Sequence, residues 1–163
     1  MTKCLYVVRH AKSSWDNPGL RDFDRPLNSR GERDAPRIGQ YLKLHEVLPD
    51  FLLSSPANRA LTTANIIAGE IGYSGAIQTD RSIYHADEDT LLNAVKKLDN
   101  GHQSAMIFGH NPGFTDFVNG LTDAEIDNIP TCGVCKIEFR METWADVKFG
   151  TGKLIFFQYP KGL

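Results

Sequence analysis

Short apolar runs alternate with helix-like segments along this chain, and this alternation restricts the fold more than any other feature. Residues 5–8, 51–53 and 105–108 are apolar runs of the length and composition typical of buried strands. Between them, apolar side chains recur at helical spacing, as in residues 60–68. The pattern predicts an α/β fold of three layers, in which a mainly parallel sheet carries helices on both faces.

Local signals predict where individual elements begin and end. Ser29 and Glu32 have the spacing of a capping box, which predicts a helix from there to about His45. Ser55 before Pro56 predicts a helix that starts at the proline with Ser55 as its N-cap and stops at Gly72. Further elements are expected as a weak strand near Ile77, helices over 89–98 and 114–121, and strands over 134–139 and 154–158.

Composition narrows the class of protein. A chain of 163 residues with 41% hydrophobic content suits one globular domain over residues 1–163. With 18 basic and 20 acidic side chains well mixed, we expect neither nucleic-acid nor membrane binding. No apolar run approaches the roughly 20 residues that span a bilayer, and the start lacks a cleavage-site pattern, so we expect a cytoplasmic protein.

The three cysteines are too few for a disulfide framework and indicate thiols in a reducing compartment. Cys132 and Cys135 have a spacing found in redox and zinc motifs, but no second ligand pair accompanies them. Their role stays open between such a motif and two small residues at the start of a strand.

Residues with chemically reactive or charged side chains come after each of the three apolar runs. Arg9 and His10 follow the first run, Arg59 lies just after the second, and His110 follows the third. Because parallel strands end at the same edge of a sheet, we expect two histidines and two arginines to gather there. Lone histidines are usually structural, and the convergence of these four residues is therefore the functional signal.

Two arginines and two histidines suit an anion with several oxygens, of which a phosphoryl group is the obvious candidate. The planar guanidinium fork matches phosphate geometry and stays charged throughout phosphoryl transfer. Neighbouring cations also disfavour protonation of His10, which keeps one ring nitrogen free as a nucleophile at neutral pH. The start of a helix near Arg59 would add backbone N–H groups to the anion site.

At this point the chain resembles the histidine phosphatase superfamily, and within it the short SixA-type phosphohistidine phosphatases. Arg9-His10-Ala11 resembles the R-H-G signature of that superfamily, with alanine in place of the glycine. The other blocks that carry the resemblance occur in the same order along the chain: residues 12–15, 24–27 with 30–31, 54–60 with 63–64, and 109–112.

The resemblance implies a role for each matching residue. His10 would be phosphorylated transiently, Arg9 and Arg59 would bind the phosphoryl oxygens, and His110 would help to stabilise their charge. Arg25 and Asn111 would belong to the substrate-binding pocket. His85 is open between a substrate contact and a structural residue.

The general acid that larger superfamily members place over the pocket has no clear match in this chain. Asp87 and Glu88 lie in about the right region and are candidates, but acids at the start of a helix are equally explained by the helix dipole. We expect neither a cofactor nor a metal ion.

The expected function is a phosphatase that removes phosphate from phosphohistidine on a partner protein. No long insertion is present to cover the pocket, and a P–N bond needs less leaving-group assistance than an alkyl phosphate. Three alternatives remain: a phosphatase of small phosphomonoesters, a catalytically silent phosphate-binding module, and a metalloenzyme using the histidines. The metalloenzyme would leave the arginines unexplained. The physiological substrate and the oligomeric state stay open.

Overall fold

The structure is a computed structural model and describes residues 2–163. Its strands are β1 (Lys3–Arg9), β2 (Phe51–Ser54), β3 (Gln78–Thr79), β4 (Ser104–Gly109), β5 (Val134–Phe139) and β6 (Gly152–Gln158). Its α-helices are α1 (Ser29–Leu44), α2 (Asn58–Ile71), α3 (Glu88–Lys96) and α4 (Gly113–Leu121). A short 3₁₀ turn, η1 (Asp22–Asp24), interrupts the long connection between β1 and α1.

All six strands belong to one sheet in the order β3-β2-β4-β1-β5-β6. The strands β1, β2, β3 and β4 run parallel, whereas β5 lies antiparallel to β1 and β6 lies antiparallel to β5. The prediction of a mainly parallel α/β sheet is therefore confirmed. Among residues 2–163, no helix is both long and apolar enough to cross a membrane.

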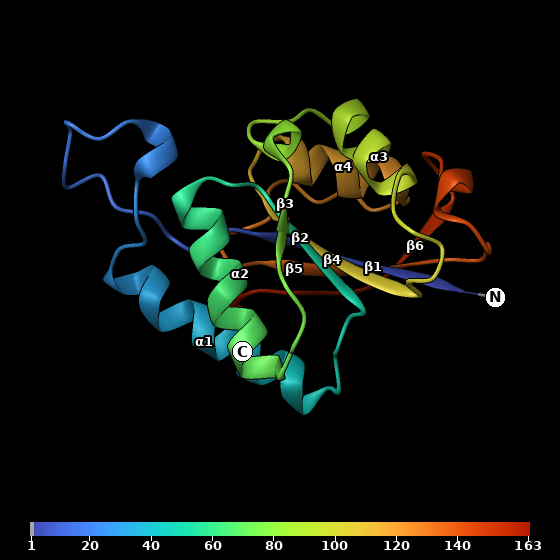
Figure 1. Cartoon of the computed structure of the whole chain (residues 1–163), viewed down its shortest axis with the longest axis horizontal. Coiled ribbons are helices and arrows are strands. Elements are labelled where there is room, and N and C mark those ends of the chain that lie inside the picture. The colour runs from blue at the N-terminus through green and yellow to red at the C-terminus, as the bar shows by residue number, and fades with distance from the viewer. Residues whose placement is uncertain (1) are drawn as a thin grey trace.

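Helices cover both faces of the sheet, with α1 and α2 on one side and α3 and α4 on the other (Figure 1). Alternate residues of β1 serve the two layers. Leu5 and Val7 join the core beneath α3 and α4, and Tyr6 and Val8 join the core beneath α1 and α2. Because a strand buried on both faces has no polar side, its sequence reads as a continuous apolar run.

The predicted capping box at the start of α1 is wrong by one residue. Asn28 is the N-cap, and its side-chain oxygen accepts the N–H of Gly31 at 2.9 Å. Ser29 is already helical. A side chain at position 31 would collide with the backbone of Lys12, so this glycine allows α1 to approach the segment that follows β1.

The predicted start of α2 is wrong by two residues. The helix begins at Asn58 and ends at Ile71, and Gly72 follows as its C-cap with a φ of 78°, the left-handed conformation that glycine favours. The Ser55 hydroxyl accepts the N–H of Ala57 at 3.2 Å, outside the helix, and its oxygen also lies against His110. Tertiary contact thus overrides the local helix-start signal.

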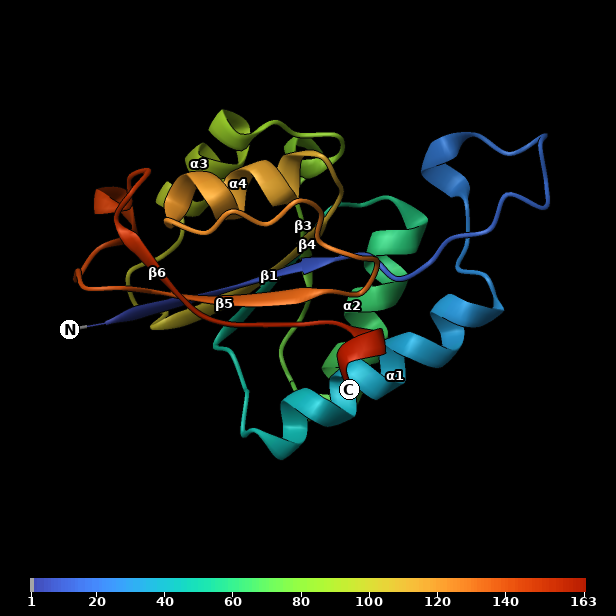
Figure 2. The ribbon, with the colours of Figure 1, turned by 180° about the vertical axis from the view of Figure 1, so that it is seen from behind.

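Several strands begin or end at the same side of the sheet. The loop over residues 11–28 extends from this side as well (Figure 2). The carboxyl ends of β1, β2 and β4 reach this edge at Arg9, Ser54 and Gly109. The antiparallel β5 starts there, because Val134 pairs with Val8. The fold therefore brings residues from distant parts of the sequence to a single rim.

Candidate active site

His10 lies immediately after β1 and is 7% exposed. Its Nδ1 lies 2.7 Å from the carbonyl oxygen of Ala11. A carbonyl oxygen only accepts, so Nδ1 carries the ring proton and Nε2 keeps its lone pair. The backbone thus fixes the tautomer that a nucleophilic imidazole requires.

The surroundings of His10 keep the ring uncharged. Burial is the main cause that lowers the pKa of His10 to about 3, and the charges of Arg59, Arg9 and Arg25 lower it further against the opposing bond to Ala11. Thr63 holds the adjacent backbone, because its hydroxyl accepts the N–H of Ala11 and donates to the carbonyl of Arg59. The nucleophile candidate and Arg59 therefore share one support.

The two arginines predicted from the sequence lie close enough to repel each other. Burial, followed by the charge of Arg59, lowers the pKa of Arg9. One end of Arg9 donates to the carbonyl of Ile129 at 2.8 Å. Arg59 is buried and Arg9 is partly buried, and such a pair of cations favours an anion between or beside them.

His110 lies against His10, with ring centroids 5.3 Å apart. Its Nε2 lies 2.8 Å from the Ser55 hydroxyl oxygen. Burial, and then the neighbouring His10 and Arg59, lowers the pKa of His110. Within residues 2–163, His110 Nδ1 and Arg9 Nε are buried polar atoms without a hydrogen-bond partner. Buried polar groups are usually satisfied, so these two atoms are exceptions, and both belong to the cluster.

Asp22 is the residue of this site that the sequence analysis did not single out. Its carboxylate accepts from Arg59 at 3.0 Å, from Arg25 at 2.8 Å and from the Tyr84 hydroxyl at 2.7 Å. Its backbone carbonyl accepts a second bond from Arg59 at 2.7 Å. Asp22 therefore places Arg59 and partly neutralises it.

The environment of Asp22 favours its ionised form. Burial alone would raise the pKa of this carboxyl, but hydrogen bonds from Tyr84, Arg59 and Arg25 together lower the pKa below its usual range. An ionised carboxylate that already accepts from three donors has no proton to give. Asp22 therefore positions Arg59 and Arg25 and does not act as a general acid.

Arg25 also lies in the cluster and is buried. Besides its bond to Asp22, its guanidinium donates to the Ser14 carbonyl at 3.0 Å and to the Ser13 hydroxyl. The indole of Trp15 lies over it, 3.3 Å from ring centroid to guanidinium carbon. Arg25 thus connects both arms of the loop formed by residues 11–28.

Comparison with known proteins agrees with this geometry. The sequence profile of the histidine phosphatase superfamily (branch 1) matches residues 5–84. An uncharacterized chloroplastic protein of Arabidopsis thaliana is 33% identical over 155 residues, which is 90% of this chain and 71% of the plant protein. The chain belongs to the histidine phosphatase superfamily.

Solved structures place the chain near the SixA-type members of the superfamily. A protein of Agrobacterium tumefaciens provisionally assigned as phosphohistidine phosphatase SixA superposes with a TM-score of 0.84 at 28% identity, over 97% of this chain and 98% of that one. The protein histidine phosphatase SixA complexed with tungstate gives 0.83 at 19% identity, over 97% of both chains, and shows the same fold. These relationships confirm the resemblance and support a phosphatase.

For this histidine phosphatase, the residues matched to the family signature lie together. His10, Arg9, Arg59 and His110 form one cluster at the rim, with Arg25 beside them. His85 reaches the same cluster, because its Nε2 lies 3.1 Å from the Asp22 carboxylate. Its φ of 55° lies in the left-handed region, which is uncommon for a residue other than glycine.

Asn111 and the two acidic candidates lie at the edge of the cluster. The Asn111 amide donates to Asn128 and Ile129 and accepts from Thr115, which ties the start of α4 to a neighbouring segment. A substrate contact by Asn111 remains a prediction. Asp87 is the N-cap of α3 and accepts the N–H of Thr90 at 2.9 Å, and Glu88 follows in the first turn. Both acids are exposed.

The cysteine pair has little thiolate character. Cys132 and Cys135 are buried free thiols, and burial raises the pKa of Cys135 to about 12. The Cys132 N–H donates to the carbonyls of Arg9 and His10. This residue therefore contributes to the site through its backbone.

Proposed function

We propose that this protein is a phosphohistidine phosphatase in which His10 Nε2 takes the phosphoryl group and water then removes it. The observation that carries the proposal is the fixed tautomer of His10, which has a free Nε2 among Arg9, Arg59 and His110. In the first step Nε2 forms a P–N bond as the leaving group departs with the bonding electron pair. In the second step water attacks phosphorus, and the histidine leaves with its electron pair restored.

The charges around His10 suit both steps. Arginine guanidinium groups stabilise the equatorial oxygens of the phosphoryl group in transfer. A neutral imidazole with a low pKa attacks without first losing a proton, and it is also a good leaving group. The protein therefore needs a strong general acid only when the substrate's leaving group is basic.

A protein as phosphoryl donor is supported by the surface beside the cluster. Trp15 stacks on Arg25 and yet is 71% exposed, and Leu20 on the same loop is also exposed. Exposed tryptophan next to a functional residue is typical of protein contact surfaces. We propose that the phosphohistidine of the substrate lies on a partner protein whose surface contacts this loop.

The test compares turnover of a phosphohistidine protein, a phosphohistidine peptide and small phosphomonoesters. We expect the protein to be preferred, and Trp15→Ala to reduce its turnover more than that of an aryl phosphate. Leu44→Ala is the matched control, because Leu44 is exposed at the other end of α1. Preference for a small phosphomonoester, or equal effects of Trp15→Ala on all substrates, would refute the protein substrate.

A further inference from the structure

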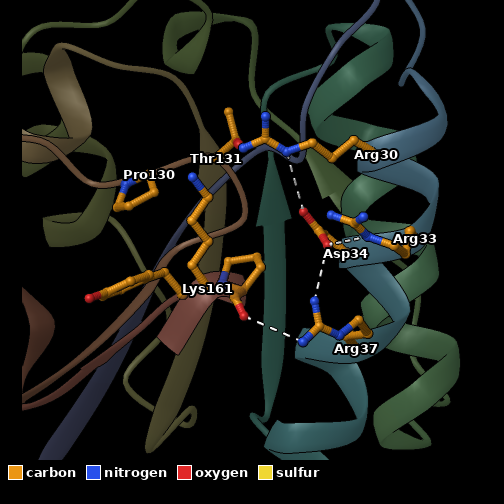
Figure 3. A pocket seen from close by; sticks show the side chains of 9 residues that line it. Arg30, Arg33, Asp34, Arg37, Pro130, Thr131 and Lys161 are labelled. Carbon is orange, nitrogen blue, oxygen red and sulfur yellow. Dashed lines mark hydrogen bonds and ion pairs between the residues drawn. The ribbon is translucent and has the colours of Figure 1, made fainter. Parts of the chain in front are cut away.

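A second cationic pocket lies on the α1 side of the molecule. It has a volume of about 220 Å³ and lies between the first half of α1, residues 130–131 and residues 159–161. Figure 3 shows the arginines of α1 along one wall and Lys161 reaching up the opposite side toward Thr131. None of these residues belongs to the cluster around His10.

The pocket is strongly positive although the whole chain has a formal charge of −2. Arg30, Arg33, Arg37 and Lys161 line it together with a single acid, Asp34, which leaves an excess of three positive charges. Cations confined to a small concave surface raise the local potential for anions. The pocket is therefore a local exception to the mixed charge of the surface.

Asp34 holds the arginines in place but cannot satisfy them. Its side chain is 4% exposed and lies 3.0 Å from Arg33, 3.4 Å from Arg37 and 4.0 Å from Arg30. Each guanidinium carries five N–H donors, far more in total than one carboxylate can accept. One further Arg37 donor reaches the Pro160 carbonyl at 3.5 Å. The three side chains stay about half exposed, so most of the remaining donors are open to a ligand.

The other lining groups add an apolar surface to this cationic wall. Pro130, Tyr159 and Pro160 complete the pocket together with Thr131. Arginine forks match the oxygens of a phosphate, whereas flat apolar groups suit a planar ring. The volume allows a small molecule rather than a folded segment.

The pocket and the catalytic cluster are separate, although one segment contacts both. Pro130 and Thr131 line the pocket, whereas the Ile129 carbonyl accepts from Arg9 and the Cys132 N–H donates to His10. We propose that this pocket is a second anion site, which binds a small phosphate monoester with a flat apolar body. The site does not depend on which substrate His10 serves.

Phenylphosphonate and inorganic phosphate are suitable probes, because neither contains an ester bond that the enzyme could hydrolyse. Binding is followed by NMR through the side-chain Nε–Hε signals of Arg30, Arg33 and Arg37. In wild type and in Arg59→Ala we expect these signals to shift saturably, with phenylphosphonate binding several-fold tighter than phosphate. Added salt should weaken both.

Arg30→Gln/Arg37→Gln should weaken binding at the pocket about ten-fold or more, with Arg33 as the reporter. Lys161→Gln, which leaves the contacts of Asp34 intact, should weaken it in the same direction. Arg140→Gln is the matched control, because Arg140 is exposed at the other end of β5. Absence of saturable shifts, or unchanged affinity in both pocket variants, would overturn the second site. Equal affinity for the two probes would overturn the apolar body of the ligand.

Discussion

Individual residues of the site have their charge and position fixed by their neighbours. His10 is neutral because it is buried among cations, and its free nitrogen is selected by the Ala11 carbonyl. Arg59 is held by both the carboxylate and the backbone carbonyl of Asp22. The catalytic groups are thus positioned before any substrate arrives.

Asp22→Asn should bind inorganic phosphate about ten-fold more tightly, or about 1.4 kcal/mol, because it removes a negative charge that shares Arg59 and Arg25 with the incoming anion. The backbone carbonyl bond to Arg59 survives this substitution, so that the arginine stays near its place. Isothermal titration measures the dissociation constant.

Asp24→Asn is the control for this charge change, because Asp24 pairs with the exposed Arg21 outside the cluster. Weaker phosphate binding in Asp22→Asn would mean that positioning Arg59 outweighs the competition for its charge.

At the scale of the element, the loop of residues 11–28 depends on Arg25. This side chain bonds both arms of the loop, through Ser13 and Ser14 on one arm and Asp22 on the other. Arg25→Ala should therefore increase amide hydrogen exchange in residues 13–24 at least several-fold, because all three bonds are lost together. Arg21→Ala, on the exposed surface of the same loop, should leave the exchange unchanged. Equal exchange in Arg25→Ala and wild type would show that the loop is held by other contacts.

A substitution at the start of α3 can distinguish a structural role of Asp87 from a catalytic one. Asp87→Asn keeps a good N-cap while it removes the acid, so we expect unchanged stability and only slightly changed phosphohistidine turnover. In wild type, turnover should depend steeply on the pKa of the leaving group. A selective loss of alkyl phosphate turnover by about 10²–10⁴-fold in the variant would identify Asp87 as a general acid after all. Glu88→Gln provides the parallel test for its neighbour.

Elements could be predicted from the sequence where burial alone decides them. The strands β1, β2 and β4 could be recognised as apolar runs in the sequence, because both faces of these strands are covered. The first residue of a helix was harder to predict. Asn28 and Ser29 are both good N-caps, and only the surrounding packing selects one of them. Ser55 contacts His110 instead of capping a helix, which no local pattern could indicate.

The site residues, too, could be predicted only where a local sequence pattern indicates their position. His10, His110, Arg9 and Arg59 could be found because each lies at or just after the end of a strand, or in the helix that follows it. Asp22 lies in a loop without periodic structure, so its position depends on contacts across the fold. Its one sequence signal was its place three residues before Arg25, and an acid near a predicted cationic pocket is a reasonable candidate partner.

At the scale of the whole molecule, the buried histidines connect the site to stability. Burial lowers the pKa values of His10 and His110, whereas an unfolded histidine titrates near pH 6.5. The unfolded state therefore binds more protons below that pH. The contribution of the two histidines to the free energy of unfolding is fully present above about pH 6.5. This contribution is lost as the pH falls toward the folded pKa of about 3 for His10.

Urea unfolding between about pH 6.5 and 5.5 measures this effect above most of the range in which carboxylates titrate. We expect the free energy of unfolding to fall by up to about 1.4 kcal/mol per pH unit for each of the two histidines. His10→Gln should lose about half of this slope, whereas His45→Gln, at an exposed position, should keep it. A slope unaffected by His10→Gln would contradict the neutral, buried state of His10.

In the proposed reaction, His10 carries the phosphoryl group during turnover. Rapid quenching of the enzyme with a phosphohistidine protein, followed by mass spectrometry of its peptides, tests this directly. We expect a transient adduct on His10 that is labile in acid, stable in base and absent from His10→Gln, which should also lose turnover. Wild-type turnover in His10→Gln, or an adduct on another residue, would contradict it.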